Sequence, residues 1–219
     1  MLAAGRIAAW ILGAILVSIL FVTVWVGLRG WMAYQHLSRI EAGITDVSSA
    51  LDSEPSAAGP PLAGLASDAS AAHDLTSDPI WHLAEGTPWI GPQLNAFGAV
   101  SAAGDTLLGD ALLPLVTAAQ DTSLDALKPV NGRIDTTELT ALAEPAQSAS
   151  VEATRAVDRL DGIDRTPLVG VMSRAVNRSA EIFGQAAKGL DALSRSTRLL
   201  PDLLGQNGER NYLLLVQNN

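Results

Sequence analysis

The hydrophobic pattern begins with an unbroken apolar segment near the N-terminus. Residues 7–28 form twenty-two consecutive positions without a charged side chain. At a rise of about 1.5 Å per residue, such a helix spans roughly 33 Å, which matches the bilayer hydrocarbon core of about 30 Å. Trp10, Trp25 and Trp31 lie near its ends, where indole rings favour the lipid headgroups. The pattern predicts one uncleaved transmembrane helix.

Two other interpretations of this segment are weaker. A cleaved signal peptide has an apolar core of about 7–15 residues followed by a small-residue cleavage site. Residues 29–32, Arg-Gly-Trp-Met, contain no such site. A buried helix of a soluble domain would need a large core around it, and the rest of the chain has little core to offer. We therefore expect a single-pass protein of the cell membrane, in direct contact with the lipid bilayer.

We infer the orientation of this helix in the membrane from the lengths of the segments on its two sides, because their charges are nearly balanced. Arg6 and the terminal amine precede the span, and Arg29 and Arg39 follow it, so the positive-inside comparison is nearly balanced. Six residues precede the span, whereas a long acidic region follows, and long domains are translocated largely regardless of charge. We expect residues 1–6 to be cytoplasmic and the C-terminal part to be extracytoplasmic.

A helical pattern continues beyond the span. Apolar residues recur there at steps of three and four, which predicts a membrane-proximal helix over residues 29–54. The helix should end before Pro55, because residues 53–61 combine helix breakers with small residues. The apolar stripe consists of Tyr34, Leu37, Ile40, Ile44, Val47 and Leu51.

Residues 55–92 are expected to hold a linker, a short helix and a loop rich in Trp and Pro. In the last part, Trp81 and Trp89 stand among three Pro and two Gly, which predicts an ordered loop rather than a helix or a strand. The two indole rings either form an exposed binding surface for a glycan or a lipid headgroup, or they cover the end of a helical bundle. The second use of Trp is the more ordinary one in such loops.

Residues 93–200 show the periodicity of long helices. The first helix is predicted from residue 93 to about residue 127, with a kink or break at Pro114. The dipeptide Asn-Gly at residues 131–132 predicts a turn after it.

Local signals also define the next helix. Asp135 and Glu138 have the spacing of a capping box, in which each side chain accepts a hydrogen bond from a free amide of the first turn. Pro145 is expected to split this helix, and Gly162 is expected to end it.

The last helix is predicted to begin at Thr166 and Pro167, an N-cap followed by Pro at the first helical position. It should run for some 32 residues, to about Leu199. The apolar stripes of these helices are rich in Ala, which lets helix axes approach closely. We therefore expect a mainly α fold, in which an alanine-rich antiparallel helical bundle follows the transmembrane helix on the extracytoplasmic side.

Residues 201–219 break the helical pattern. Residues 201–205, Pro-Asp-Leu-Leu-Gly, are expected to close the last helix, and residues 211–217 form a continuous apolar run of strand length. A run this apolar is typical of a central strand buried on both faces, yet no other segment predicts a strand to pair with it. We expect this region to be the start of an incomplete C-terminal α/β domain, so that the sequence stops inside a larger protein.

Composition narrows the possible functions. The chain has a net charge of −9, and residues 45–219 contain eleven Lys or Arg against twenty-two Asp or Glu. Such an acidic region repels phosphate backbones, so nucleic acid is not expected as a partner. Cysteine is absent, which excludes disulfides, cysteine-ligated metals and thiol catalysis.

No catalytic or metal-binding motif is present. The three His are scattered at residues 36, 73 and 82, and the chain has no zinc-protease, nucleophile-elbow, phosphate-loop or dinucleotide motif. Asp158, Asp161 and Asp164 faintly resemble a calcium loop, but they lack its alternate-residue spacing and its terminal Glu. Solvated charges at a helix end explain them better. We expect no cofactor, no metal and no enzymatic activity from this chain.

Several motifs resemble the actinobacterial membrane proteins of domain-of-unknown-function family 4012. Besides the apolar N-terminal segment, they are residues 78–81 (Asp-Pro-Ile-Trp), 87–92 (Thr-Pro-Trp-Ile-Gly-Pro), 131–135 (Asn-Gly-Arg-Ile-Asp), 200–205 (Leu-Pro-Asp-Leu-Leu-Gly) and 210–219 (Arg-Asn-Tyr-Leu-Leu-Leu-Val-Gln-Asn-Asn). The similarity covers nearly the whole chain, and its last motif is the most specific. In that family this motif runs on into Ala-Glu-Leu-Arg-Ala-Thr-Gly-Gly.

The resemblance implies a cell-envelope protein. Members of the family have no established activity but are often linked with surface polysaccharide production, which would make envelope polysaccharide or its assembly proteins the partners. The architecture is also similar to that of the LytR-CpsA-Psr glycopolymer transferases, although their phosphate-binding arginines have no counterpart here. We expect an extracytoplasmic scaffold, with a helical sensor or ligand-binding module as the alternative. The candidate binding residues are Trp81, Trp89, Gln217 and Asn218.

Overall fold

The computed structural model describes residues 2–53, 58–120, 136–206 and 208, and within these ranges all regular structure is helical. The prediction of a mainly α protein with an apolar N-terminal helix is therefore confirmed. The predicted turn at residues 131–132 and the predicted strand at residues 211–217 lie outside the described residues. The helices are α1 (Leu2–Ser53), α2 (Gly59–Thr76), α3 (Pro79–Glu85), α4 (Gly91–Asp105), the π-helix η2 (Thr106–Leu112), α5 (Leu113–Gln120), α6 (Thr137–Asp161) and α7 (Gly170–Leu203).

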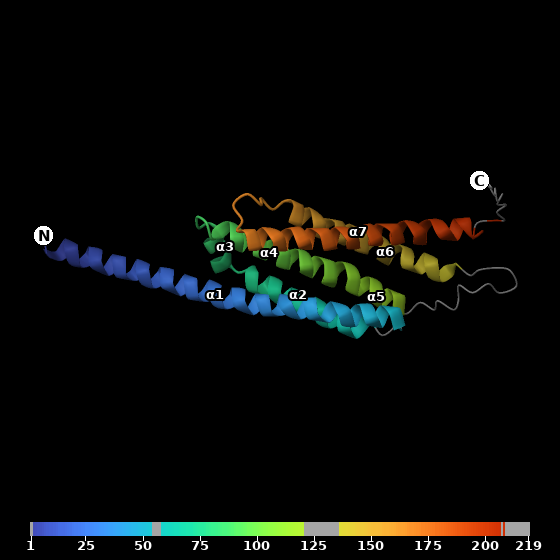
Figure 1. Ribbon diagram of the computed structural model, residues 1–219, viewed down its shortest axis with the longest axis horizontal. Helices are drawn as coiled ribbons and strands as arrows, with labels where there is room; N and C mark the ends of the chain where they lie inside the picture. Colours follow the sequence, from blue (N-terminus) through green and yellow to red (C-terminus); the bar gives the residue numbers. More distant parts are fainter. Residues whose placement is uncertain (1, 54–57, 121–135, 207, 209–219) are drawn as a thin grey trace.

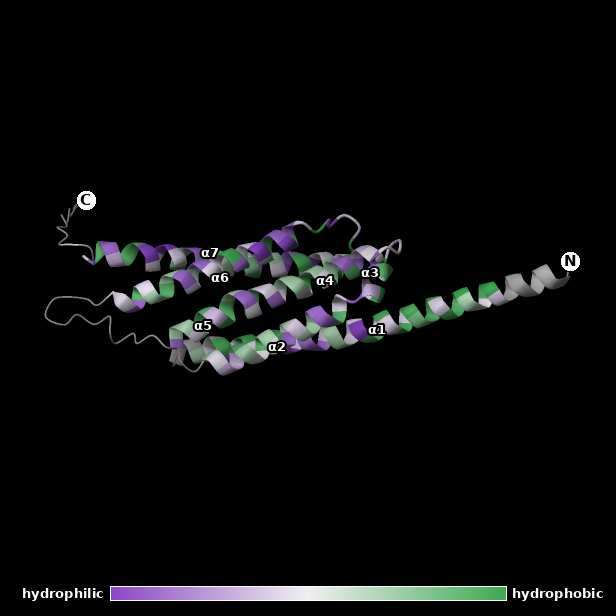
Figure 2. Ribbon diagram, turned by 180° about the vertical axis from the view of Figure 1, so that it is seen from behind, coloured by the Kyte–Doolittle hydropathy of each residue, from purple (hydrophilic) through white to green (hydrophobic). Residues whose placement is uncertain are grey.

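Helix α1 is the longest element of the described part of the chain, and its N-terminal end extends beyond the other helices. Figure 1 shows the N-terminal part projecting alone, while the other long helices lie along the same axis beside the C-terminal part. In Figure 2 the projecting part is coloured mostly as hydrophobic. Of the most apolar 18 consecutive residues within the stretch Trp10–Val47, only 6% are buried. The N-terminal part of α1 is therefore a candidate membrane span, by length, composition and exposure.

A second stretch, Gly91–Gln120, is also long and apolar enough to cross a membrane. Its mean hydropathy is 1.3, against 2.6 for the stretch in α1, and 44% of its most apolar window is buried. It packs against α2 and α6 on different sides. These neighbours make it a core helix of the helical region.

The contact between α1 and α2 differs from the predicted stripe. Leu37, Ile40 and Val47 of that stripe are half-buried, whereas Tyr34 and Ile44 are exposed by 62 and 50%. Ala33, outside the stripe, is fully buried. A Cβ atom on Gly43 would lie 2.6 Å from Cδ2 of Leu65, so the Leu65 side chain packs directly on this glycine of α1. The spacing of apolar residues predicted the helix itself. The face of α1 that is covered depends on α2, because small residues let two helix axes approach each other closely.

The main hydrophobic core lies between α6, α7 and the stretch α4–η2. Alanines on α6 are fully or almost fully buried there, and Leu160 and Val176 fill the space between them. The alanines are Ala146, Ala149, Ala153 and Ala156. Small side chains on α6 thus let α7 pack along its length, in the pair of helices with the most extensive contact.

The helix predicted from residue 93 starts slightly earlier, and its predicted end near residue 127 lies outside the described residues. It begins at Gly91, and it continues through the π-helix η2 into α5 without a break at Pro114. The amide of Leu113 donates to the carbonyl of Leu108, five residues earlier. Pro114 has no amide to donate, and the wider turns before it absorb this loss without a kink large enough to end the helix.

Helix α6 continues through Pro145, so the predicted split at this residue is wrong. Pro145 lies inside the helix, and the buried residues of α6, from Ala146 to Leu160, all follow it and pack into the main core. Proline in a helix interior costs about 3 kcal/mol, which burial of several apolar side chains outweighs. Asp135 of the predicted capping box lies outside the described residues; the N-cap is Thr136, whose side chain accepts no capping hydrogen bond.

Helix α7 begins later and ends later than predicted. Its N-cap is Val169, not Thr166, because residues 162–169 form turns of their own. The carboxylate of Asp164 accepts a hydrogen bond from the amide of Thr166 at 2.9 Å, and the amide of Leu168 donates to the carbonyl of Arg165 at 3.2 Å. The helix ends at Leu203, within the closing segment predicted at residues 201–205, and Pro201 itself lies inside the last turns.

Candidate functional site

The predicted Trp and Pro loop is in part a helix. Residues Pro79–Glu85 form α3 because Asp78 caps its first turn: one carboxylate oxygen accepts hydrogen bonds from the amides of Ile80 at 2.8 Å and Trp81 at 3.1 Å. Pro79 occupies the first helical position, where its missing amide costs nothing. The prediction of an irregular loop is therefore wrong for this segment, and the Asp-Pro pair was the signal in the sequence that could have identified the helix.

Arg29 joins three helices at this point. Its guanidinium donates to the Asp78 carboxylate at 2.6 Å and to the carbonyls of Asp74 and Leu75 at 3.3 and 3.4 Å. These carbonyls belong to the last turn of α2, where they have no partner within the helix. The same guanidinium lies 5.1 Å from the ring centroid of Trp25. One side chain at the border of the apolar segment thus ties α1 to the end of α2 and the start of α3.

The Asp78 carboxylate is stabilised in its charged form. Its side chain is 16% exposed, and this burial raises its pKa. The hydrogen bonds from the amides of Trp81 and Ile80 and the positive charge of Arg29 lower it, and together they hold the pKa of Asp78 below its ordinary value. The ion pair with Arg29 therefore persists at neutral pH.

Trp81 and Trp89 have opposite environments. Trp81 is 1% exposed, and its ring lies 6.1 Å from the ring of Phe97, centroid to centroid. A Cβ atom on Gly30 would lie 3.5 Å from the Trp81 ring, so α1 packs directly on it. Trp89 is 89% exposed, and its φ of 73° is the one positive value found for a non-glycine residue in the described part of the chain. Only Trp81 covers a core; Trp89 faces outward.

An apolar groove lies between α1 and the helices beside it. Its volume is about 570 Å³, within the usual range of about 300–1,000 Å³ for small-molecule sites. One wall is the side of α1 that includes Ile19, Val22 and Val26, which belong to the predicted span. The opposite wall comes from α3, α4 and the start of α7, with Trp81, Ala84, Ile90, Leu94, Phe97 and Met172 among its residues.

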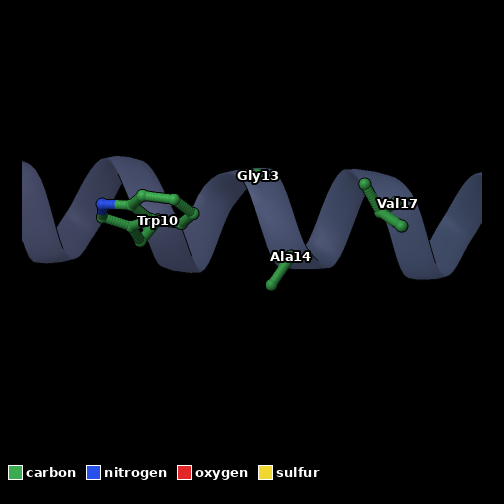
Figure 3. Close-up of a pocket in the computed structure, with 4 residues that line it drawn as sticks. All are labelled: Trp10, Gly13, Ala14 and Val17. Atoms are coloured by element: carbon green, nitrogen blue, oxygen red, sulfur yellow. The ribbon is translucent and has the colours of Figure 1, made fainter.

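A second hollow, of about 510 Å³, lies on the projecting part of α1. It is lined by Trp10, Gly13, Ala14 and Val17, all from this one helix. Figure 3 shows that Gly13 and Ala14 leave a shallow surface between the larger side chains of Trp10 and Val17. Such a depression has no second wall and encloses no ligand.

Two polar clusters lie elsewhere between the helices. The Asp68 carboxylate on α2 is 2.6 Å from Nδ1 of His36 and 3.5 Å from the guanidinium of Arg39, both on α1. Beside η2, burial raises the pKa of Asp105, with added repulsion from neighbouring carboxylates and partial compensation by His73. π-Helical turns often accompany functional sites, but these groups form no recognisable catalytic arrangement.

No group of three or more His, Cys, Asp or Glu is close enough to hold a metal ion in the described ranges. Two of the three acidic residues that faintly resembled a calcium loop, Asp161 and Asp164, have local partners for their side chains. Asp161 pairs with Arg165 at 3.7 Å, and Asp164 accepts a hydrogen bond from the amide of Thr166, which lowers its pKa.

Two of the four candidate binding residues, Trp81 and Trp89, lie at the same end of the helical region. Trp81 is buried there and Trp89 is exposed. Gln217 and Asn218 lie outside the described residues. Sequence reasoning missed Arg29 as the partner of Asp78, because the two residues are far apart in the chain. It also missed Gln93, whose amide group contacts two separate loops.

Comparisons with models of known protein families, with curated proteins and with solved structures gave no match.

Proposed function

We propose that this protein is a membrane-anchored scaffold whose helical bundle is held rigidly on the extracytoplasmic side of the cell membrane, with residues 1–6 in the cytoplasm. The observation that carries this proposal is the continuity of α1. One helix of 52 residues contains both the exposed apolar segment and the face that packs against α2. A rigid helix transmits the orientation of the membrane span to the rest of the protein.

The exposed apolar side chains of α1 support the membrane anchor. Trp10, Ile11 and Leu16 are exposed by 79, 56 and 63%, and at 3.6 residues per turn they point in three different directions around the helix. Water would solvate this surface poorly, whereas acyl chains would cover it from every side. The lipid bilayer is therefore the proposed first partner of this chain.

The junction at Arg29 supports the rigid connection. Arg29, Gly30 and Trp31 follow the apolar segment directly, and the first two contact Asp78 and Trp81 of the helical region. Because these contacts begin within two residues of the predicted membrane border, the domain has little freedom to tilt on its anchor. This geometry suits a scaffold that presents a surface at a fixed height and angle.

The role in the cell envelope rests on the family resemblance of the sequence motifs. It predicts that the scaffold serves surface polysaccharide assembly, together with polysaccharide or its assembly proteins. Deletion of the gene should then change the amount or chain length of surface polysaccharide, measured after extraction from intact cells. An unchanged envelope would contradict this role.

A flexible insertion tests the scaffold itself. A Gly-Ser linker placed after Leu28 interrupts α1 between the predicted span and Arg29, which pairs with Asp78 at the start of α3, and it should fail to restore polysaccharide in the deletion strain. The same linker after Gly205, beyond the end of α7, leaves the contacts of α1 intact and should restore it. Equal rescue by both variants would show that a rigid connection is not required.

The apolar groove favours a second function, the ligand-binding module. Its walls suit an acyl chain, and the ligand would be a lipid. Gly27 lines the groove, and a Cβ atom there would meet no atom within 4 Å, so Gly27→Leu should fill the groove without disturbing the fold. Gly13→Leu is the matched control on the same helix, outside the groove. If native mass spectrometry finds bound lipid lost only in Gly27→Leu, the groove is a lipid site; equal lipid content in both variants would contradict this.

A further inference from the structure

A set of exposed apolar side chains gathers at one end of the helical region. We name it the end surface; it comprises Leu83, Trp89, Ile90, Val169 and Val171, with exposed fractions of 71, 89, 62, 59 and 71%. These residues come from α3, from the turn before α4 and from the start of α7. In Figure 1, α3 and the start of α7 lie at the end from which α1 projects alone. Apart from Ile90, which also lines the groove, neither the main core nor the groove explains why these residues are apolar.

Gln93 holds the two loops of the end surface together. Its side-chain amide donates to the carbonyl of Trp89 at 3.3 Å and to the carbonyl of Pro167 at 2.9 Å, and its Oε1 accepts from the amide of Val169 at 3.1 Å. The loop before α4 and the loop before α7 are therefore one hydrogen-bonded unit. The end surface is built into the fold.

Trp89 is held outward at a cost in backbone energy. Its positive φ is unfavourable for a residue with a side chain, and such conformations persist where the surrounding structure imposes them. The flanking hydrogen bonds impose it here: the amide of Ile90 donates to the carbonyl of Pro88 at 2.9 Å, and the amide of Gly91 donates to the carbonyl of Thr87 at 2.9 Å. The turn thus presents its indole ring to the surroundings.

The end surface is continuous with the predicted membrane span. Ile90 and Met172 line the same groove as Ile19 and Val22 of α1. Ile19 precedes Leu28, the end of the predicted span, by nine residues, or roughly 14 Å along a helix. The end surface therefore lies beside the part of α1 that crosses the outer leaflet.

We propose that the end surface inserts into the outer leaflet of the bilayer that α1 crosses, so that this chain contacts the membrane twice. This inference rests on the proposed membrane anchor. Lipid is the occupant because the apolar surface joins the lipid-facing side of α1, and because Trp favours the region between acyl chains and headgroups. With two contacts, the helical region is fixed against rotation about α1 as well as against tilting.

The absence of cysteine allows a direct test on the full-length chain. Single cysteines replace Trp89 and Val171 in the end surface, Val17 in the span, and Leu199 on the far part of α7, all of which are exposed. Each variant carries an environment-sensitive fluorophore and is reconstituted into vesicles of phosphatidylcholine and phosphatidylglycerol that contain nitroxide-labelled acyl chains. Labels at positions 17, 89 and 171 should be quenched several-fold more strongly than the label at position 199.

The outcomes separate the two proposals. If position 17 is quenched while positions 89 and 171 behave like position 199, the end surface stays in water and this inference is wrong, although the anchor stands. If position 17 is not quenched, the proposed anchor itself fails. Gln93→Ala should reduce quenching at position 89 while circular dichroism stays unchanged, because the loops lose their shared hydrogen bonds. Unchanged quenching in that variant would overturn the positioning role of Gln93.

Discussion

Nη1 of Arg29 lies 2.6 Å from Oδ2 of Asp78, forty-nine residues further along the chain. Both side chains are mostly buried, with exposed fractions of 24 and 16%. The pair links the border of the apolar segment to the N-cap of α3, and the same carboxylate accepts the amides of the first turn of that helix. This carboxylate therefore joins the end of the apolar segment to α3, beside the contact between Gly30 and Trp81.

Removal of the Asp78 carboxylate should therefore destabilise the protein measurably. Asp78→Ala loses an N-cap and leaves Arg29 without its charged partner, which should lower the free energy of unfolding by about 1–3 kcal/mol. The measurement is denaturant unfolding in detergent micelles, followed by circular dichroism. The matched control is Asp191→Ala, which removes the exposed ion pair with Arg195 on α7 and should change stability by less than about 0.5 kcal/mol. Equal losses in the two variants would contradict the assigned role.

The lowered pKa of Asp78 also predicts a pH dependence. Because the folded-state pKa lies below the ordinary value of 3.8, the charged carboxylate stabilises the folded state at every pH above 3.8. This contribution is lost as the pH falls from 3.8 through the lower, folded-state pKa. Unfolding midpoints measured from neutral pH into this acidic range should fall less steeply for Asp78→Asn than for the wild type. Parallel curves would show that Asp78 titrates at its ordinary pKa.

Replacement of Trp81 and of Trp89 by alanine should affect the stability of the protein very differently. Trp81→Ala removes a buried ring that packs on Phe97 and α1, so unfolding should require about 3–5 kcal/mol less free energy. Trp89→Ala removes an exposed ring, and its effect should stay within about 0.5 kcal/mol in detergent. Denaturant unfolding of both variants compares them directly. A large loss from Trp89→Ala would mean that its ring packs against the protein.

Two glycines allow a matched test of close packing. A Cβ atom on Gly91 would lie 2.0 Å from the carbonyl oxygen of Glu85, a backbone atom that cannot move aside easily. Gly91→Ala should therefore destabilise the protein by about 1–3 kcal/mol. A Cβ atom on Gly184, inside α7, would meet no atom within 4 Å, so Gly184→Ala should stabilise it by about 0.5–1 kcal/mol. Thermal unfolding should shift in opposite directions, and a shift in the same direction would refute the clash at Gly91.

Local sequence rules predicted which segments are helical better than they predicted where each helix begins and ends. The end of α1 at Ser53, before Pro55, follows from breakers that act within a few residues. Residues 201–205 likewise contain the end of α7 at Leu203, whereas Pro145 does not end its helix. The cost of a proline in a helix is local, whereas the burial that compensates for it comes from helices far away in the chain. Such compensation is invisible in a local pattern.

The candidate site was located from the sequence only as a region. The density of Trp, Pro and Gly between residues 78 and 92 indicated an unusual segment, and Asp78 followed by Pro79 carried an N-cap signal that was not used. The roles of Arg29 and Gln93 depend on partners that are distant in the chain. Spacing along the chain contains no information on such pairs.

The sequence by itself determined the helical class of this protein and the apolar N-terminal helix, because periodicity, length and the absence of charge are properties of a continuous segment. The tertiary structure alone decided which face of α1 meets α2, and which tryptophan is buried. Trp81 and Trp89 have similar neighbours in the sequence, yet one packs between Gly30 and Phe97 and the other faces outward. The physical reason is that burial depends on which surfaces lie opposite a side chain, and those surfaces come from segments that only folding brings together.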